Sequence, residues 1–351
     1  MKKLSLLFSL FLLLFVTFGQ IPSHYYSNAE GKTQEELRTA LYEIISNGYV
    51  MRTYAQLWTD FKTTDMRPDG YVWDMYSNCE FVFGEHQDTG TGGTAECQFY
   101  NREHSLPNSW FGGVNNVPMY TDLFHLYPTD KYVNNKRDNY PFGETNNPNS
   151  TFGNGSKLGS CSFSGYSGVV FEPIDEYKGD FARTYLYMAT KYLDKNFTYD
   201  LGAVTFSYDN STCDLTEYAV NLLLKWHRND PVSSKEINRN NAVYTIQYNR
   251  NPYIDYPIMV EHIWGNLQNE VWYSGVGITN HENKPNITIT KQNDGIFIEG
   301  AVPHSKVEIY SMIGQNVYSS VLSSNFISLS FLKQGLYIIK MEGFTTKIVW
   351  F

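Results

Sequence analysis

The amino-acid sequence predicts an α+β fold, with strands and surrounding helices in most of the chain and a small all-β sandwich at its end. Segments with helical periodicity alternate with strand-like segments up to about residue 265, whereas only short alternating segments follow residue 284. The polar, glycine-containing stretch 273–283 between them is expected to be a linker. We therefore expect one domain at 20–272 and a second at 284–351.

Residues 1–19 predict a signal peptide. Lys2 and Lys3 precede an almost wholly apolar run at 4–18, and Thr17 and Gly19 are small residues at the spacing of a cleavage site. This run is shorter than the roughly 20 residues that a spanning helix needs. No later segment is apolar enough to span a membrane, so we expect export without stable membrane insertion.

The first helix is expected after a capping box formed by Thr33 and Glu36, with an apolar stripe through Ile45 and a stop at Gly48. Alternating apolar residues then predict two strands, and a Gly-Thr-rich run predicts the loop that follows them. These three segments are 71–76, 79–83 and 89–94.

Three more helices are indicated farther along the chain. One covers 180–192, a second begins at Asp214 and passes Trp226, and a third begins at Ser233 and ends before Pro252.

The stretch 146–162 is rich in Asn, Gly and Ser and predicts a long surface loop. The expected strands of the final domain are 287–289, 296–298, 307–310, 327–329 and 336–340.

The overall charge of the chain bears on how it could bind a polyanion such as a nucleic acid. Its formal net charge is −9, which argues against binding nucleic acid over the whole surface, because phosphate contacts require Lys and Arg. The stretch 225–250 is nevertheless locally basic. Arg239 within it is a candidate for contacting a polyanion.

Four cysteines in an exported chain predict disulfides. Their proximity in sequence favours Cys79–Cys97 and Cys161–Cys213 among the three possible pairings. A zinc site is the alternative, but no two of these cysteines have the close spacing of a zinc knuckle.

The stretch 101–111 supplies a carboxylate next to an imidazole. His104 is a candidate general base, because a neutral imidazole accepts a proton near pH 7. Glu103 is a candidate ligand for Mg²⁺, which prefers oxygen donors. Adjacent residues of a regular strand point to opposite faces, so the two share a site only if the strand ends or distorts there, as Pro107 suggests. Taken alone, each would more often be an ordinary polar residue.

The stretch 122–137 supplies an amide and a guanidinium. If Thr129 or Asp130 caps a helix, Asn134 and Arg137 lie three residues apart on one face. Asn134 is the second candidate metal ligand, through its amide oxygen. Arg137 either stabilises the charge that develops on a phosphate during hydrolysis or forms a surface salt bridge.

These two stretches resemble the endonuclease I family, secreted bacterial nucleases built around a ββα-metal (His-Asn-His-type) motif. The family's glutamate–histidine pair matches Glu103-His104, and its metal-binding asparagine matches Asn134. The resemblance covers roughly 30–265. It continues at 139–144, 171–180, 224–232, 236–241 and 249–255.

The resemblance implies a secreted metal-dependent endonuclease. The enzyme would hydrolyse phosphodiester bonds of DNA, and also of RNA, without sugar preference and would leave a 5′-phosphate. The expected cofactor is Mg²⁺, with Mn²⁺ or Ca²⁺ as alternatives.

The chain departs from the family pattern at two points. Family members usually carry a histidine where this chain has Phe124, and His125 is the residue that would compensate. Some members also place a phosphate-binding arginine between the glutamate–histidine pair and the helix, where this chain has no Arg or Lys. Arg102, Arg137 or Arg183 would then have to contact the phosphate.

The tail resembles the C-terminal sorting domains of proteins exported by the type IX secretion system, through 307–315 and 332–340. This resemblance implies the type IX machinery as a partner and a secreted or cell-surface location. A surface adhesion or glycan-binding protein is the alternative function, suggested by the tail, the negative charge and an aromatic content of 16%. A nuclease fold with reduced or lost activity is a further alternative, because of Phe124.

Overall fold

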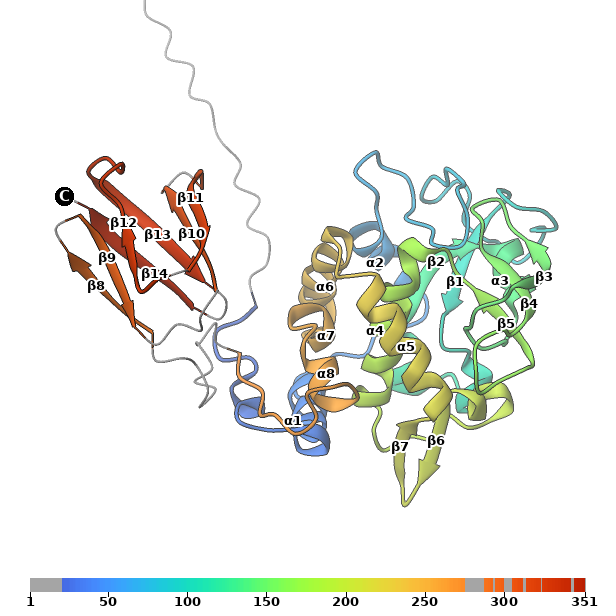
Figure 1. Cartoon of the computed structure of the whole chain (residues 1–351). Coiled ribbons are helices and arrows are strands. Elements are labelled where there is room, and N and C mark those ends of the chain that lie inside the picture. Colours follow the sequence, from blue (N-terminus) through green and yellow to red (C-terminus); the bar gives the residue numbers. More distant parts are fainter. Residues whose placement is uncertain are drawn as a thin grey trace, which may run out of the picture. The chain divides into compact units, whose positions relative to one another are not determined.

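The computed structural model describes residues 21–274, 287–292, 294–299, 305–311, 314–322, 324–341 and 344–350. The chain divides into two compact units between Ser274 and Gly275 (Figure 1). The expected signal peptide and nearly all of the expected linker lie outside the described residues. Helices and small antiparallel sheets in the first unit and strands in the second confirm the α+β class.

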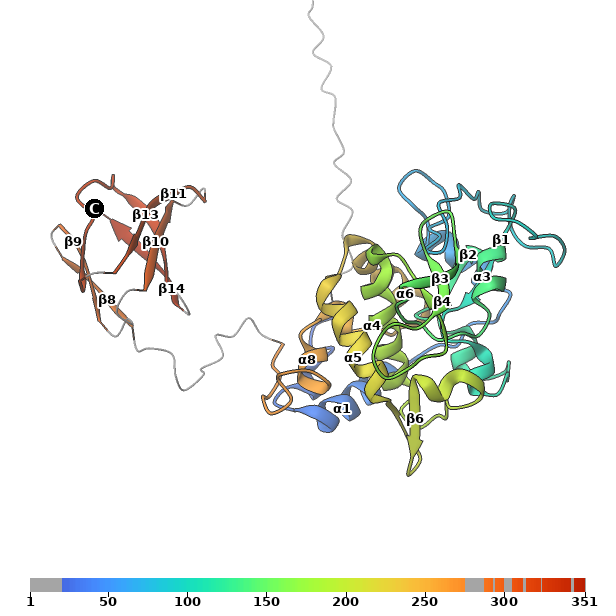
Figure 2. The same ribbon diagram turned by 45° about the vertical axis from the view of Figure 1, so that its right-hand side comes forward.

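The helices of the larger unit surround α4 (Asp175–Lys191), whose residues from Gly179 onward are all buried. Packed against it are α1 (Gln34–Ser46) and α5 (Glu217–Asn229), and Figures 1 and 2 both show α5 running alongside it. The remaining helices are α2 (Leu57–Thr64), α3 (Lys131–Arg137), α6 (Ser234–Gln247), α7 (Pro252–Asp255) and α8 (Met259–Ile263). None of the helices in the described part of the chain is long and apolar enough to cross a membrane.

Short 3₁₀ turns complete the helical part of the larger unit. They are η1 (Ser27–Ala29), η2 (Asn108–Phe111), η3 (Pro118–Thr121) and η4 (Asp200–Val204). Two of them, η2 and η3, lie in the connection between the first two strands, so this pair of strands is not a tight hairpin.

The strands of the larger unit form three small antiparallel sheets. β1 (Tyr100–His104) pairs with β2 (Leu126–Asp130), with Glu103 opposite Tyr127 and His104 opposite Leu126. Helix α3 begins directly after β2 and packs on both strands (Figure 1). The other sheets contain β3 (Asn147–Thr151), β4 (Lys157–Ser160) and β5 (Val169–Glu172), and β6 (Phe206–Asp209) and β7 (Thr212–Leu215).

The smaller unit has two antiparallel sheets around its own core, to which Ile298, Ile309 and Ile339 contribute. One sheet has the order β12-β9-β8 and the other β11-β10-β13-β14. All five predicted strands are present, and β11 and β14 were not predicted. The strands are β8 (Thr288–Gln292), β9 (Gly295–Glu299), β10 (Lys306–Ser311), β11 (Asn316–Val321), β12 (Phe326–Ser328), β13 (Gly335–Met341) and β14 (Phe344–Trp350).

Most predicted helices are present, with differences at their starts. Ser233 forms a complete capping box with Glu236 at α6. Thr33 precedes α1 without a side-chain capping bond. The helix expected at Asp214 begins instead after Thr216, whose hydroxyl accepts from the backbone N–H of Ala219, because Asp214 still pairs in β7.

Three predictions of local structure were wrong. Residues 71–76 and 79–83 are not strands, since the Asp74 carboxylate and Ser77 hydroxyl accept backbone N–H groups that a ladder would need. The expected loop 146–162 contains β3 and β4. In addition to these three errors, helix α2 is present although no helix was predicted there.

The cysteine prediction was half right. Cys79 and Cys97 form a disulfide, but Cys161 and Cys213 are free thiols. Cys213 is buried within the β6–β7 pair, opposite Tyr208. The Cys161 sulfur instead lies 3.6 Å from the Tyr218 hydroxyl. Proximity in sequence therefore did not bring these two sulfurs together.

Candidate active site

A hollow beside β1 and α3 brings five of the predicted residues together. We call it the β1–α3 hollow, and its lining includes Arg102, Glu103, His104, Asn134 and Arg137. The remaining lining residues are Pro107, Asn108, Ser109, Asn135, Asp138 and Asn139. The hollow is therefore formed by the end of one strand, the turn after it and one helix with its C-terminal extension.

Strand β1 ends directly after the adjacent residues Glu103 and His104. The ladder with β2 stops at His104, and Ser105 begins a turn that leads to Pro107 and η2. Glu103 is 3% exposed, whereas His104 is only partly buried. Because the regular strand stops at this point, both side chains can line the same hollow, as predicted.

The Glu103 carboxylate is anchored through one of its oxygens. Oε1 accepts hydrogen bonds from the Tyr76 hydroxyl and from Arg137 Nη1, each at 3.0 Å. Oε2 accepts none from the side chains that the structure describes. Burial raises the pKa of Glu103 to about 7, although Arg137 and Tyr76 act in the opposite direction. The carboxylate therefore has one oxygen fixed by the protein and one available to a ligand.

The His104 ring is held in one tautomer. Its Nε2 lies 2.9 Å from the backbone carbonyl oxygen of Tyr120. A carbonyl can only accept, so Nε2 carries the proton and Nδ1 keeps a lone pair. Burial lowers the pKa of His104 to about 3, and the neighbouring His125 acts in the same direction. The imidazole is therefore neutral near pH 7, as a proton acceptor must be.

Asn134 is oriented by a contact to β1. Its Nδ2 donates to Asn101 Oδ1 at 2.9 Å, and within the described chain its own Oδ1 accepts no hydrogen bond. Helix α3 is fixed at its start by Asp130, whose Oδ1 accepts from the backbone N–H groups of Tyr132 and Val133. The amide oxygen of Asn134 is thus free for a cation.

Arg137 lies on the same side of α3 but is fully buried. Its Nη1 donates to Glu103 Oε1 and to the His104 carbonyl oxygen. Its Nη2 donates to the Ser105 carbonyl oxygen at 2.6 Å and to the Tyr185 hydroxyl. These contacts support the end of β1, so the guanidinium holds the protein rather than reaching outward.

Arg102 is the other guanidinium at the hollow. It lies between two aromatic rings, 3.5 Å from the centroid of Tyr54 and 4.3 Å from that of Trp58. Its Nη1 donates to the Tyr54 carbonyl oxygen at 2.7 Å. Stacking of this kind fixes the direction of a guanidinium while leaving its other N–H groups able to donate.

Three other predicted substrate-binding residues are buried outside the hollow. Arg183 is fully buried and donates to Glu236. Arg239 is 6% exposed and pairs with Asp65. His125 is also fully buried, with Nε2 donating to a backbone carbonyl. Each of the three side chains is bonded to a different protein group inside the fold, namely Glu236, Asp65 and the Met119 carbonyl oxygen, so none is positioned as a substrate contact.

Phe124, where the family usually has a histidine, does not line the hollow. It is 2% exposed, and its ring centroid lies 4.6 Å from that of Tyr187. Sequence reasoning missed Tyr76 and Tyr120. No local signal could identify them, because one contact is made by a hydroxyl 27 residues away and the other by a backbone carbonyl.

The zinc alternative finds no support in the described residues. The only group of three His, Cys, Asp or Glu residues there with mutually close ligand atoms is Cys79, Cys97 and Asp130. The two cysteine sulfurs of this group are joined in the disulfide and cannot act as thiolate ligands.

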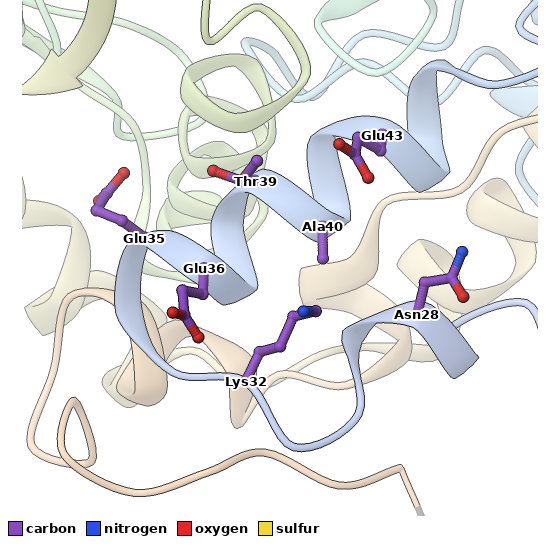
Figure 3. Close-up of a pocket in the computed structure, with 7 residues that line it drawn as sticks. All are labelled: Asn28, Lys32, Glu35, Glu36, Thr39, Ala40 and Glu43. Carbon is purple, nitrogen blue, oxygen red and sulfur yellow. The ribbon is translucent and has the colours of Figure 1, made fainter.

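A second hollow lies between η1 and α1 (Figure 3). Lys32 and Asn28 from the N-terminal segment face α1 residues that include three glutamates. These glutamates are Glu35, Glu36 and Glu43. This acidic surface is unsuited to a phosphate and contains none of the predicted residues.

Comparison with known proteins identifies relatives of the larger unit. The family model "Endonuclease I" matches residues 33–258. An extracellular ribonuclease of Bacillus amyloliquefaciens is 33% identical over 241 residues, which are 68% of this chain and 78% of that protein. An extracellular ribonuclease of Bacillus subtilis is 32% identical over 243 residues, with the same shares. Endonuclease-1 of Buchnera aphidicola subsp. Baizongia pistaciae is 30% identical over 135 residues, 38% of this chain and 46% of that protein.

Proposed function

The chain belongs to the endonuclease I family and is a nuclease, and we propose that it is a secreted, metal-dependent endonuclease with His104 as general base. The proposed substrates are DNA and RNA, cleaved without sugar preference. Two of its relatives are named extracellular ribonucleases and another is named Endonuclease-1. The product would carry a 5′-phosphate.

The observation that carries this proposal is the tautomer of His104. Because Nε2–H is used by the Tyr120 carbonyl, Nδ1 is the atom that would accept a proton from water. That water would attack phosphorus as the bond to the 3′-oxygen breaks. A neutral imidazole with its Nδ1 lone pair unprotonated can take this proton.

The donor atoms around the hollow fit a hard divalent cation. Glu103 Oε2 and Asn134 Oδ1 are oxygen donors without side-chain partners in the described chain, and Mg²⁺ commonly takes one or two protein oxygens with water and phosphate completing its shell. Mn²⁺ or Ca²⁺ would suit the same donors. When bound, the cation would neutralise the scissile phosphate and the departing 3′-oxygen. The arrangement of β1, β2 and α3 supports describing this part as a ββα-metal unit.

The two guanidiniums at the hollow would have different tasks. Arg102, stacked between Tyr54 and Trp58, would donate to a substrate phosphate. Arg137 would position Glu103 and the end of β1, because its Nη1 and Nη2 atoms already donate to protein acceptors. The burial of Phe124 away from the hollow argues against a loss of activity at that position.

Export would follow from the two ends of the chain. Residues 1–19 would direct the chain across the inner membrane, and the domain at 284–351 would be read by the type IX secretion machinery, after a linker at 273–283. The extracellular relatives support secretion. Release into the medium and attachment to the cell surface are both compatible with this route.

A plasmid-nicking assay tests the proposal. The purified protein should convert supercoiled plasmid to nicked and linear forms with Mg²⁺ or Mn²⁺, and should stop when EDTA is added. The 5′ ends of the products should be ready for ligation without kinase treatment. Cleavage that continues at full rate in excess EDTA would exclude the metal-dependent mechanism.

A further inference from the structure

Tyr76 reaches the candidate active site from a segment that has no role in the function proposed above. Its side chain is fully buried, and its ring centroid lies 4.8 Å from Phe171 and 5.8 Å from Phe181. The hydroxyl donates to Glu103 Oε1 at 3.0 Å. Because the ring is enclosed by other aromatic rings, the hydroxyl has little freedom to turn away from the carboxylate.

The segment around Tyr76 is also connected to the start of α3. The Oδ1 atom of Asp74 accepts from the backbone N–H of Tyr76 at 2.8 Å. Its Oδ2 atom accepts from the backbone N–H of Asp130 at 3.0 Å. One carboxylate therefore connects the residue that contacts Glu103 to the residue that caps α3.

Helix α3 carries the second candidate ligand. Asp130 caps the helix through Tyr132 and Val133, and Asn134 follows one turn later. A continuous set of contacts thus runs from Glu103 through Tyr76, Asp74 and Asp130 to the helix of Asn134. Arg137 makes none of these contacts, although it donates to the same oxygen of Glu103, and the Tyr76 hydroxyl adds no formal charge to the set.

We propose that Tyr76 is a positioning residue for the divalent cation, acting through Glu103. By holding Oε1, the hydroxyl fixes the carboxylate so that Oε2 is left for the cation, while Asp74 keeps α3 and its asparagine in register with β1. Partners of this kind around a metal ligand typically change metal affinity by 10–100-fold when they are removed. The inference rests on the proposed function, because it requires Glu103 to be a ligand.

The test is calorimetric titration of the full chain with Mn²⁺ in the absence of nucleic acid. Tyr76→Phe removes only the hydroxyl and is expected to weaken the Mn²⁺ Kd by about 10–100-fold. Tyr253→Phe is the matched control, since Tyr253 is also fully buried and its hydroxyl shares a hydrogen bond with Thr190. That control should bind Mn²⁺ as the wild type does.

The cleavage rate gives a second reading. Raising the Mn²⁺ concentration should restore the plasmid-cleavage rate of Tyr76→Phe toward that of the wild type, which it would not do if the substitution merely damaged the fold. A wild-type Kd in Tyr76→Phe would overturn the positioning role.

Failure of the proposed function would look different. If Glu103→Ala binds Mn²⁺ as tightly as the wild type, Glu103 is not a ligand and both proposals fall. If Glu103→Ala loses binding while Tyr76→Phe keeps it, only the role of Tyr76 falls.

Should Tyr76→Phe not fold, Asp74→Asn replaces it and is expected to weaken the Mn²⁺ Kd at least fivefold. An unchanged Kd there, or two variants that both fail to fold, would overturn the assignment in favour of a purely structural role.

Discussion

Removal of the Cys79–Cys97 disulfide is expected to destabilise the larger unit by about 3 kcal/mol. The two cysteines are 18 residues apart. Closing a loop of that size in the unfolded chain removes conformational entropy worth about 3 kcal/mol at 25 °C. The perturbation is the double variant Cys79→Ala/Cys97→Ala, which abolishes the bridge without leaving a lone reactive thiol.

The assay is urea-induced unfolding followed by tryptophan fluorescence. The midpoint of the double variant should fall by an amount that, multiplied by the slope of the wild type, corresponds to about 3 kcal/mol. Cys161→Ala is the control, because this thiol is free and only partly buried. Its free energy of unfolding should stay within about 0.5 kcal/mol of the wild type.

Two results would show that the disulfide does not have this effect or that the pairing of the cysteines is different. A double variant as stable as the wild type would show that loop closure contributes nothing here. A loss in Cys161→Ala as large as that of the double variant would show that Cys161 is bridged in the folded protein.

Three further predictions concern pH, substrate binding and the tail. Burial lowers the pKa of His227 to about 4, and Arg183 beside it acts in the same direction, so the folded protein keeps neutral an imidazole that the unfolded chain protonates near pH 6.5. The free energy of unfolding should therefore fall as the pH drops from about 6.5 to 4, and urea titrations of His227→Gln should show a smaller fall. Arg102→Ala is expected to raise the KM for DNA about tenfold or more with a smaller change in kcat, as steady-state assays would measure. A chain ending at Ser274 should fold and cleave DNA as the full chain does but remain inside the outer membrane of its native host; aggregation, or loss of most activity per folded molecule, would contradict this.

The residues of the candidate site could be found from the sequence because local signals coincide with the resemblance to the endonuclease I family. A glutamate and a histidine are adjacent, and a proline three residues later predicts the end of the strand. Asp130 is a typical N-cap residue, so it indicates the start of the helix that carries Asn134 and Arg137, and it caps that helix in the structure. Together with the resemblance to the endonuclease I family, these short-range features selected four residues that line one hollow.

The direction in which a side chain points could not be predicted in the same way. Arg137 is buried because acceptors from β1 and from Tyr185 on α4 meet there. His125 is buried just before β2, a strand whose five residues are all buried. When both faces of a strand are covered, the alternation that separates inward from outward residues is lost.

The errors in local structure have a related cause. Residues 71–76 and 79–83 have the apolar alternation of strands, but Asp74 and Ser77 take the backbone N–H groups that pairing would require. The Asn- and Gly-rich stretch 146–162 lacks that alternation, yet β5 gives β4 a partner. Pairing depends on a neighbouring strand that the local sequence does not reveal.

The role of His104 is tested most directly by the turnover of His104→Ala on supercoiled plasmid at saturating Mg²⁺, with and without added imidazole. We expect kcat to fall by roughly 10²–10⁴, the usual contribution of a general base. DNA binding should be nearly unchanged, and the rate should recover in part as free imidazole is added. Turnover of His104→Ala equal to that of the wild type would contradict the assignment of His104 as the base.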